Sequence, residues 1–162
     1  NPDRALATIL FTDIVGSTDL IEKLGDGVWR GLIDRHDAIS QESVTLYRGR
    51  IVKNTGDGIL ATFDGPGRAV ECAKLVLAKM GEVGIGLRAG LHTGEIELRE
   101  DDIGGVNVNL AARIMNQAER GQIMVSRTVA DLMVGNPDVS FNSIGQKRLK
   151  GFSSKLELLF AV

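Results

Sequence analysis

A tight-turn signal, the Asp57-Gly58 dipeptide between two short apolar segments, constrains the fold more than any other feature of this chain. The segments cover residues 50–53 and 58–63, and this pattern is typical of a β-hairpin. Before the hairpin, residues 5–11 predict a buried strand, and a Gly-Ser-Thr turn then leads into a helix over about 19–24. After it, residues 66–82 predict a helix and residues 87–96 a long strand. The predicted order is strand, two helices, hairpin, helix and strand.

The remaining residues extend this order without a linker or a repeat. We expect a helix over about 105–119, then a strand, a short helix and a terminal hairpin. The β-α-β-β-α-β order indicates a ferredoxin-like core of the α/β (α+β) class with additions at its C-terminal end. Such a sheet is mainly antiparallel and carries its helices on one face. We expect a ligand on the other face, where the end of the first strand and the hairpin tip lie side by side.

Composition narrows the function classes. With 162 residues and 43% hydrophobic residues, the chain has enough apolar material for one domain spanning 1–162. The net charge of −2 and the absence of a long basic run give no reason to expect nucleic acid or direct membrane contact. One cysteine excludes an internal disulfide, and the helical apolar stripe around Cys72 indicates a buried thiol. Because the chain begins at Asn1, we expect a domain cut from a longer protein.

Two carboxylates fall where predicted strands end. Asp13 lies in residues 11–18 (FTDIVGST), and Asp57 lies in residues 53–58 (KNTGDG). Two such side chains can hold two divalent metals over a nucleotide triphosphate. The first backbone N–H groups of the helix that starts after Gly16 point at this region. Such unpaired N–H groups at a helix start favour the binding of phosphate. The competing structural interpretations are a turn aspartate for Asp57 and a helix cap for Asp13.

A third cluster covers residues 101–113 (DDIGGVNVNLAAR). Asn109 and Arg113 are four residues apart and therefore lie on neighbouring positions of one helix face. An asparagine inside a helix competes for backbone hydrogen bonds, so a functional role would explain its presence. The alternative is a solvated rim in which Asn109 and Arg113 bond a loop or water.

The three clusters, in this order and spacing, resemble the catalytic domain of class III nucleotide cyclases over residues 6–160. The resemblance implies two divalent cations, Mg²⁺ or Mn²⁺, with the following ligands: Asp13, Asp57 and the backbone carbonyl of Ile14. The turn that would face the phosphates consists of Gly16, Ser17 and Thr18. Lys53 and Asp102 match the family's purine-reading pair. Asn109 matches its ribose-orienting residue, Arg113 its transition-state residue and Lys150 its triphosphate-contacting residue.

This set of residues implies an adenylate cyclase that forms 3',5'-cyclic AMP and pyrophosphate from ATP. A lysine and an acid complement the acceptor and donor edge of adenine, so Lys53 with Asp102 favours ATP over GTP. Because Asp101 stands beside Asp102, the sequence leaves open which of these two adjacent acids reads the purine. In the family the metal aspartates and the other residues come from different subunits. Because this chain carries both sets, we expect a homodimer with composite active sites.

Two alternatives remain open at this point. A guanylate or mixed-specificity cyclase would use the same machinery. A catalytically silent domain would bind nucleotide or dimerise for regulation, because ferredoxin-like folds host many functions. The absence of an apolar stretch of membrane-spanning length and of a signal-peptide pattern leads us to expect a cytoplasmic domain, with any membrane attachment left to the rest of the parent protein.

Overall fold

An eight-stranded sheet forms the centre of residues 3–162, the part of the chain that the computed structural model describes. Residues 1–2 of the predicted 1–162 domain lie outside the described part. The strands are β1 (Asp3–Ile14), β2 (Arg50–Asn54), β3 (Ile59–Phe63), β4 (Leu87–Leu98), β5 (Ile103–Gly104), β6 (Ile123–Ser126), β7 (Phe141–Arg148) and β8 (Lys155–Ala161). The helices are α1 (Ser17–Leu24), α2 (Asp26–Leu46), α3 (Pro66–Glu82), α4 (Val106–Met115) and α5 (Arg127–Leu132).

The strand order confirms the predicted core. Along the sheet the order is β2-β3-β1-β4-β6-β8-β7, with β5 paired to β4. The first four of these strands, with α2 and α3, make the ferredoxin-like unit, and β6 to β8 are the predicted C-terminal additions. Strand β6 runs parallel to β4, whereas every other pair is antiparallel. The sheet is therefore mainly antiparallel, as predicted.

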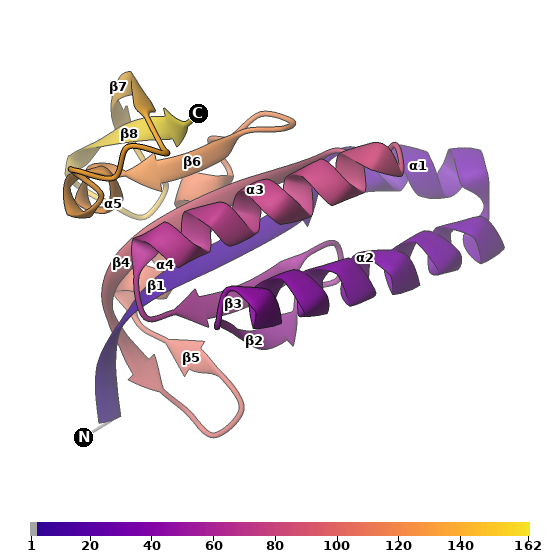
Figure 1. Cartoon of the computed structure of the whole chain (residues 1–162), viewed down its shortest axis with the longest axis horizontal. Helices are drawn as coiled ribbons and strands as arrows, with labels where there is room; N and C mark the ends of the chain where they lie inside the picture. Colours follow the sequence, from indigo (N-terminus) through magenta and orange to yellow (C-terminus); the bar gives the residue numbers. More distant parts are fainter. Residues whose placement is uncertain (1–2) are drawn as a thin grey trace.

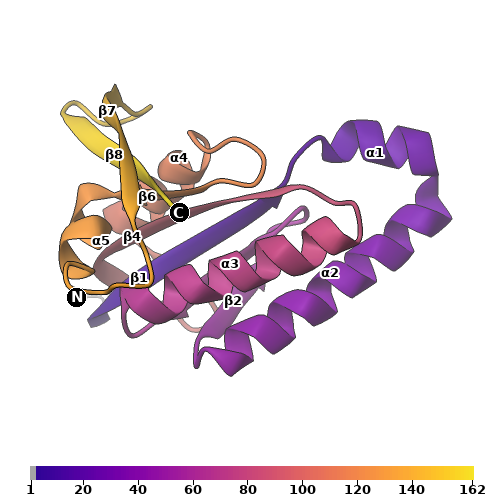
Figure 2. The same cartoon turned by 45° about the horizontal axis from the view of Figure 1, so that its top comes forward.

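Alternating residues of β1 point into two different cores. Leu10 packs with residues of α2 and α3, while Ile9 packs with Val108 and Ala111 of α4. The pleat of a strand sends successive side chains to opposite faces, so α4 lies across the sheet from α2 and α3. Figures 1 and 2 show this arrangement, with β1 and β4 between the two layers. The core helices share one face as predicted, and the added helix α4 covers part of the face expected to be open.

The two largest differences from the predicted element boundaries are at the ends of β1 and α4. Strand β1 continues to Ile14 and therefore includes Asp13, because its pairing with β4 persists to its last residue. Helix α4 ends at Met115 instead of about residue 119. The chain turns there because Ala118 is buried and the backbone N–H of Gly121 donates to the carbonyl of Leu87 at 2.8 Å. This turn starts β6 beside β4.

The cysteine follows the prediction from its helical stripe. Cys72 on α3 is fully buried, and burial raises the pKa of its thiol to about 12. A thiol with such a pKa stays protonated near neutral pH and packs as a small apolar side chain.

Candidate active site

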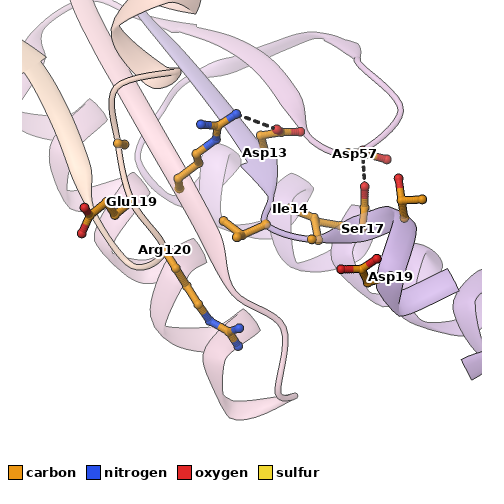
Figure 3. Close-up of a pocket in the computed structure, with 12 residues that line it drawn as sticks. Asp13, Ile14, Ser17, Asp19, Asp57, Glu119 and Arg120 are labelled. Carbon is orange, nitrogen blue, oxygen red and sulfur yellow. Dashed lines mark hydrogen bonds and ion pairs between the residues drawn. The ribbon is translucent and has the colours of Figure 1, made fainter. Parts of the chain in front are cut away.

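The β2–β3 turn is docked onto the end of β1, which brings Asp13 and Asp57 into one pocket (Figure 3). The backbone N–H of Ile14 donates to the carbonyl of Asp57 at 2.8 Å, and the N–H of Ile59 donates to Oγ1 of buried Thr12 at 3.2 Å. Gly58 lies against β1 so closely that a β-carbon there would overlap the carbonyl oxygen of Thr12. The hairpin glycine is thus required for this close approach.

The two carboxylates sit in an environment that suits a divalent cation. Burial raises the pKa of Asp13, its bond with Arg88 counteracts this rise, and the negative charge of Asp57 raises the pKa further. The hydroxyl of Ser17 donates to Oδ2 of Asp57 at 2.6 Å, which orients that carboxylate. Carboxylate oxygens are the ligands that Mg²⁺ and Mn²⁺ prefer, and a cation between them would relieve their repulsion. The residues present therefore fit a metal site, although residues 3–162 contain no group of three or more His, Cys, Asp or Glu side chains arranged to hold a metal ion together.

Arg88 is a pocket residue that the sequence reasoning missed. It is the second residue of β4 and lies directly opposite Asp13 in the ladder, and its Nη2 lies 3.4 Å from Oδ2 of Asp13. Its guanidinium also donates to the backbone carbonyl of Asn116 at 3.3 Å, which ties it to the end of α4. An arginine within an otherwise apolar strand segment, residues 87–91, was the available signal. The guanidinium places a permanent positive charge beside the two carboxylates.

The pocket has a volume of about 450 Å³ and continues over the start of α1. Gly16, in the left-handed conformation with φ of 70°, precedes the first turn of this helix, whose unpaired N–H groups favour an anion. Arg120 also lines the pocket, but Figure 3 shows its guanidinium pointing away from Asp13 and Asp57. The predicted metal ligands and the residues of the predicted phosphate-facing turn all line this one pocket: Asp13, Ile14, Asp57, Gly16, Ser17 and Thr18.

Lys53 and Asp102 form an ion pair away from this pocket. Nζ of Lys53 on β2 donates to Oδ2 of Asp102 at 2.9 Å, and the N–H of Ile103 donates to Oδ1 at 2.7 Å. The bond with Lys53 is the main reason that the pKa of Asp102 is lowered. Both side chains remain accessible, at 48% for Lys53 and 37% for Asp102. Of the two adjacent acids, it is Asp102 that lies against Lys53.

The remaining predicted residues also lie outside the pocket. On α4, Asn109 is exposed and Arg113 is half-buried. Lys150 is exposed in the turn between β7 and β8, next to buried Leu149. None of Lys53, Asp102, Asn109, Arg113 and Lys150 lines the pocket of the two aspartates. Within a single chain the predicted site residues therefore divide into those that line the pocket and those that lie outside it.

With this geometry in view, the chain matches the model of the adenylate and guanylate cyclase catalytic domain family over residues 3–161. The chain belongs to this family. It is 32% identical over 138 residues to an adenylate cyclase from Streptomyces coelicolor, which covers 84% of this chain and 36% of that protein. It spans 28% of the length of a further relative, from Rhizobium meliloti.

Solved structures share the fold. The adenylyl cyclase CyaB from P. aeruginosa is similar with a TM-score of 0.89 and 24% identity, covering 100% of this chain and 96% of that one. An adenylate/guanylate cyclase/hydrolase from Silicibacter pomeroyi has a TM-score of 0.85 and 29% identity, covering 100% and 99%. These two structures are thus named for adenylate and for adenylate/guanylate cyclases. Within residues 3–162, no helix is both long enough and apolar enough to cross a membrane.

Proposed function

We propose that this chain converts ATP into 3',5'-cyclic AMP and pyrophosphate as a homodimer with composite active sites. The observation that carries the proposal is the separation of the predicted site residues into two groups. The first group, around Asp13 and Asp57, faces a pocket that lacks any predicted base, ribose or transition-state residue. The second group, Lys53, Asp102, Asn109, Arg113 and Lys150, lies outside this pocket on the same chain, with Asn109 and Lys150 exposed. A symmetric dimer would bring the first group of each copy to the second group of the other.

Asp13, Asp57 and the carbonyl of Ile14 would hold two divalent cations, Mg²⁺ or Mn²⁺. When bound, these cations lower the proton affinity of the ribose 3'-hydroxyl and screen the phosphate charges. The Ser17 hydroxyl keeps the Asp57 carboxylate in a fixed orientation for this role. Arg88, held between Asp13 and Asn116, is placed to exchange its carboxylate partner for a phosphate oxygen when substrate and metal enter.

The second group would act on the nucleoside and the α-phosphate. The 3'-hydroxyl releases its proton to solvent as its oxygen attacks the α-phosphorus, the bond to the bridging oxygen breaks, and pyrophosphate leaves with those electrons. Asn109 would orient the ribose for this attack, which is a contribution of positioning. Arg113 keeps its proton in any protein environment, and its planar fork suits the charge that builds on the α-phosphoryl oxygens. Lys150 would contact the triphosphate.

The Lys53–Asp102 pair supports adenine as the base. Each Asp102 oxygen accepts one hydrogen bond within the chain and keeps a further lone pair, while the Lys53 ammonium has three donors. The pair can therefore donate to N1 and accept from the exocyclic amine of adenine without separating. Guanine carries an acceptor where adenine carries this amine. Changing Lys53→Glu together with Asp102→Ser should shift the ratio of kcat/KM values from ATP toward GTP, and an unchanged ratio would contradict the assignment.

Complementation tests the shared site. Asp57→Ala removes a metal ligand and Arg113→Ala removes the transition-state charge, so each variant alone should lose most activity, about 10² to 10⁴-fold. A mixture contains heterodimers with one intact site, and random pairing predicts about a quarter of the wild-type activity. The readout is cyclic AMP separated from ATP by chromatography. A mixture that stays inactive, although both variants dimerise in sedimentation experiments, would exclude the composite site.

A further inference from the structure

Strand β4 presents an unusual row of residues to α4. Gly90, His92 and Gly94 alternate along the strand and therefore share the face that α4 covers. A β-carbon at Gly90 would overlap the backbone of Met115, and one at Gly94 would overlap the side-chain amide of Asn107. Near both of its own ends, helix α4 thus lies directly on the backbone of β4. His92 is the side chain that β4 inserts between these two contacts.

His92 is held by hydrogen bonds on both ring nitrogens. The amide Nδ2 of Asn107 donates to the carbonyl of Glu95 at 2.8 Å, so its Oδ1 is left to accept from Nε2 of His92 at 3.0 Å. The other nitrogen, Nδ1, then accepts from the hydroxyl of Ser126 at 2.7 Å. Ser126 in turn accepts from the N–H of Val129 at the start of α5. All these donors and acceptors match when His92 is neutral with its proton on Nε2.

The Asn107 contact determines which residues of α4 face outward. An α-helix advances about 100° per residue, so Asn109 lies about 200° and Arg113 about 240° around the axis from Asn107. Pinning Asn107 to β4 therefore turns Asn109 and Arg113 away from the strand. Their accessibility agrees, because Asn109 is exposed and Arg113 is half-buried. A rotation of α4 would move both side chains together.

We propose that His92 and Asn107 are positioning residues that fix the rotation and depth of α4 and so aim Asn109 and Arg113 at the substrate. This inference rests on the proposed function. Neither residue lines the pocket of the two aspartates or bonds the Lys53–Asp102 pair. Loosening the contact should therefore lower kcat and leave the KM for ATP nearly unchanged, since a displacement of about 1 Å can cost 10²-fold in rate.

The first test compares Asn107→Ala with the wild-type protein. We expect kcat to fall about 10 to 100-fold while KM changes less than about threefold. Asn142→Ala, at an exposed asparagine on β7, is the matched control and should leave both constants unchanged. His92→Gln keeps one donor and one acceptor and should retain more kcat than His92→Ala. An Asn107→Ala variant with wild-type kcat, or with a loss confined to KM, would overturn the proposal.

Complementation separates positioning from general damage. Asn107→Ala mixed with Asp57→Ala should recover activity, because each heterodimer has one site with an intact metal pocket and an intact α4. The same variant mixed with Arg113→Ala should not recover, since every site then has a defective α4. Failure of both mixtures would indicate a misfolded variant and overturn the proposal.

A further measurement is independent of activity. Nitrogen NMR of histidine-labelled protein at pH 7 should show His92 protonated at Nε2 alone, and the opposite tautomer would overturn the proposal. If the Asp57→Ala and Arg113→Ala mixture stays inactive, the proposal of a composite site is wrong, independently of the positioning role of His92 and Asn107. The positioning role is then decided by the kcat of Asn107→Ala and by this NMR result.

Discussion

The Ser17 side chain contacts Asp57 in addition to its place in the predicted phosphate-facing turn. Its hydroxyl donates to Oδ2 of Asp57 across 40 residues of sequence, at 2.6 Å. A hydrogen bond to a metal-binding carboxylate fixes the direction of its oxygens and is commonly worth 10 to 100-fold in metal affinity. The helix start and the hairpin tip are therefore coupled through one side chain.

We expect Ser17→Ala to raise the Mn²⁺ concentration needed for half-maximal activity about tenfold, because Asp57 then loses its orienting donor. The measurement is a Mn²⁺ titration of cyclic AMP formation at saturating ATP. Ser140→Ala, at an exposed serine whose side chain forms no hydrogen bond in the described structure, is the control. An unchanged Mn²⁺ requirement for Ser17→Ala would show that this bond does not orient the metal ligand.

His92 should make folding stability depend on pH. Burial lowers the pKa of His92 below its value of about 6.5 in an unfolded chain. The unfolded state therefore binds more protons near and below that pH, so the free energy of unfolding falls as pH falls. Urea unfolding between pH 7.5 and 5.5 should show this loss, at most about 1.4 kcal/mol per pH unit. In His92→Gln the slope should be smaller, and an equal slope would assign it to other groups.

At the scale of elements, the docking of the β2–β3 turn onto β1 brings two aspartates that are distant in the sequence into one pocket. Gly58 allows it, since a β-carbon there would overlap the carbonyl of Thr12. We expect Gly58→Ala to displace the turn, lower the free energy of unfolding by about 1 to 3 kcal/mol and reduce activity at least 100-fold. Thermal unfolding and cyclic AMP formation measure the two effects.

Gly67→Ala on α3 is the control for this substitution, because a β-carbon there would meet only Asn136 at 3.9 Å. It should keep full activity and stability. A Gly58→Ala protein as active as Gly67→Ala would mean that the turn tolerates displacement.

The sequence predicted elements whose signals are local. The Asp57-Gly58 turn, the helix of residues 66–82 and the order of elements along the chain follow from dipeptides and periodicity. The end of α4 at Met115 was not predictable in this way, because it depends on burial of Ala118 and on a bond from Gly121 to the distant Leu87.

The same distinction applies to the site. Arg88 was not predicted as a site residue because its role follows from its register opposite Asp13. This is a contact between residues 75 positions apart. The His92–Asn107 contact likewise exists only once α4 lies on β4. Side chains joined through tertiary structure carry no spacing pattern in the sequence.

In the whole molecule, the two sets of residues proposed to form the catalytic site do not meet within one chain. The pocket of Asp13 and Asp57 lies at the end of β1, while Asn109 and Arg113 face outward from α4. An isologous dimer would use both halves twice, so activity would require association. Activity then becomes a function of protein concentration as well as of substrate and metal.

Cyclic nucleotide formation over a range of protein concentrations tests this dependence most directly. The purified chain is assayed with Mn²⁺ and either ATP or GTP from well below to well above the concentration at which sedimentation shows dimers. We predict cyclic AMP from ATP, with specific activity that rises with the dimer fraction and then reaches a plateau. A specific activity independent of concentration while the protein is monomeric, or no cyclic nucleotide from the dimer, would contradict a shared catalytic site.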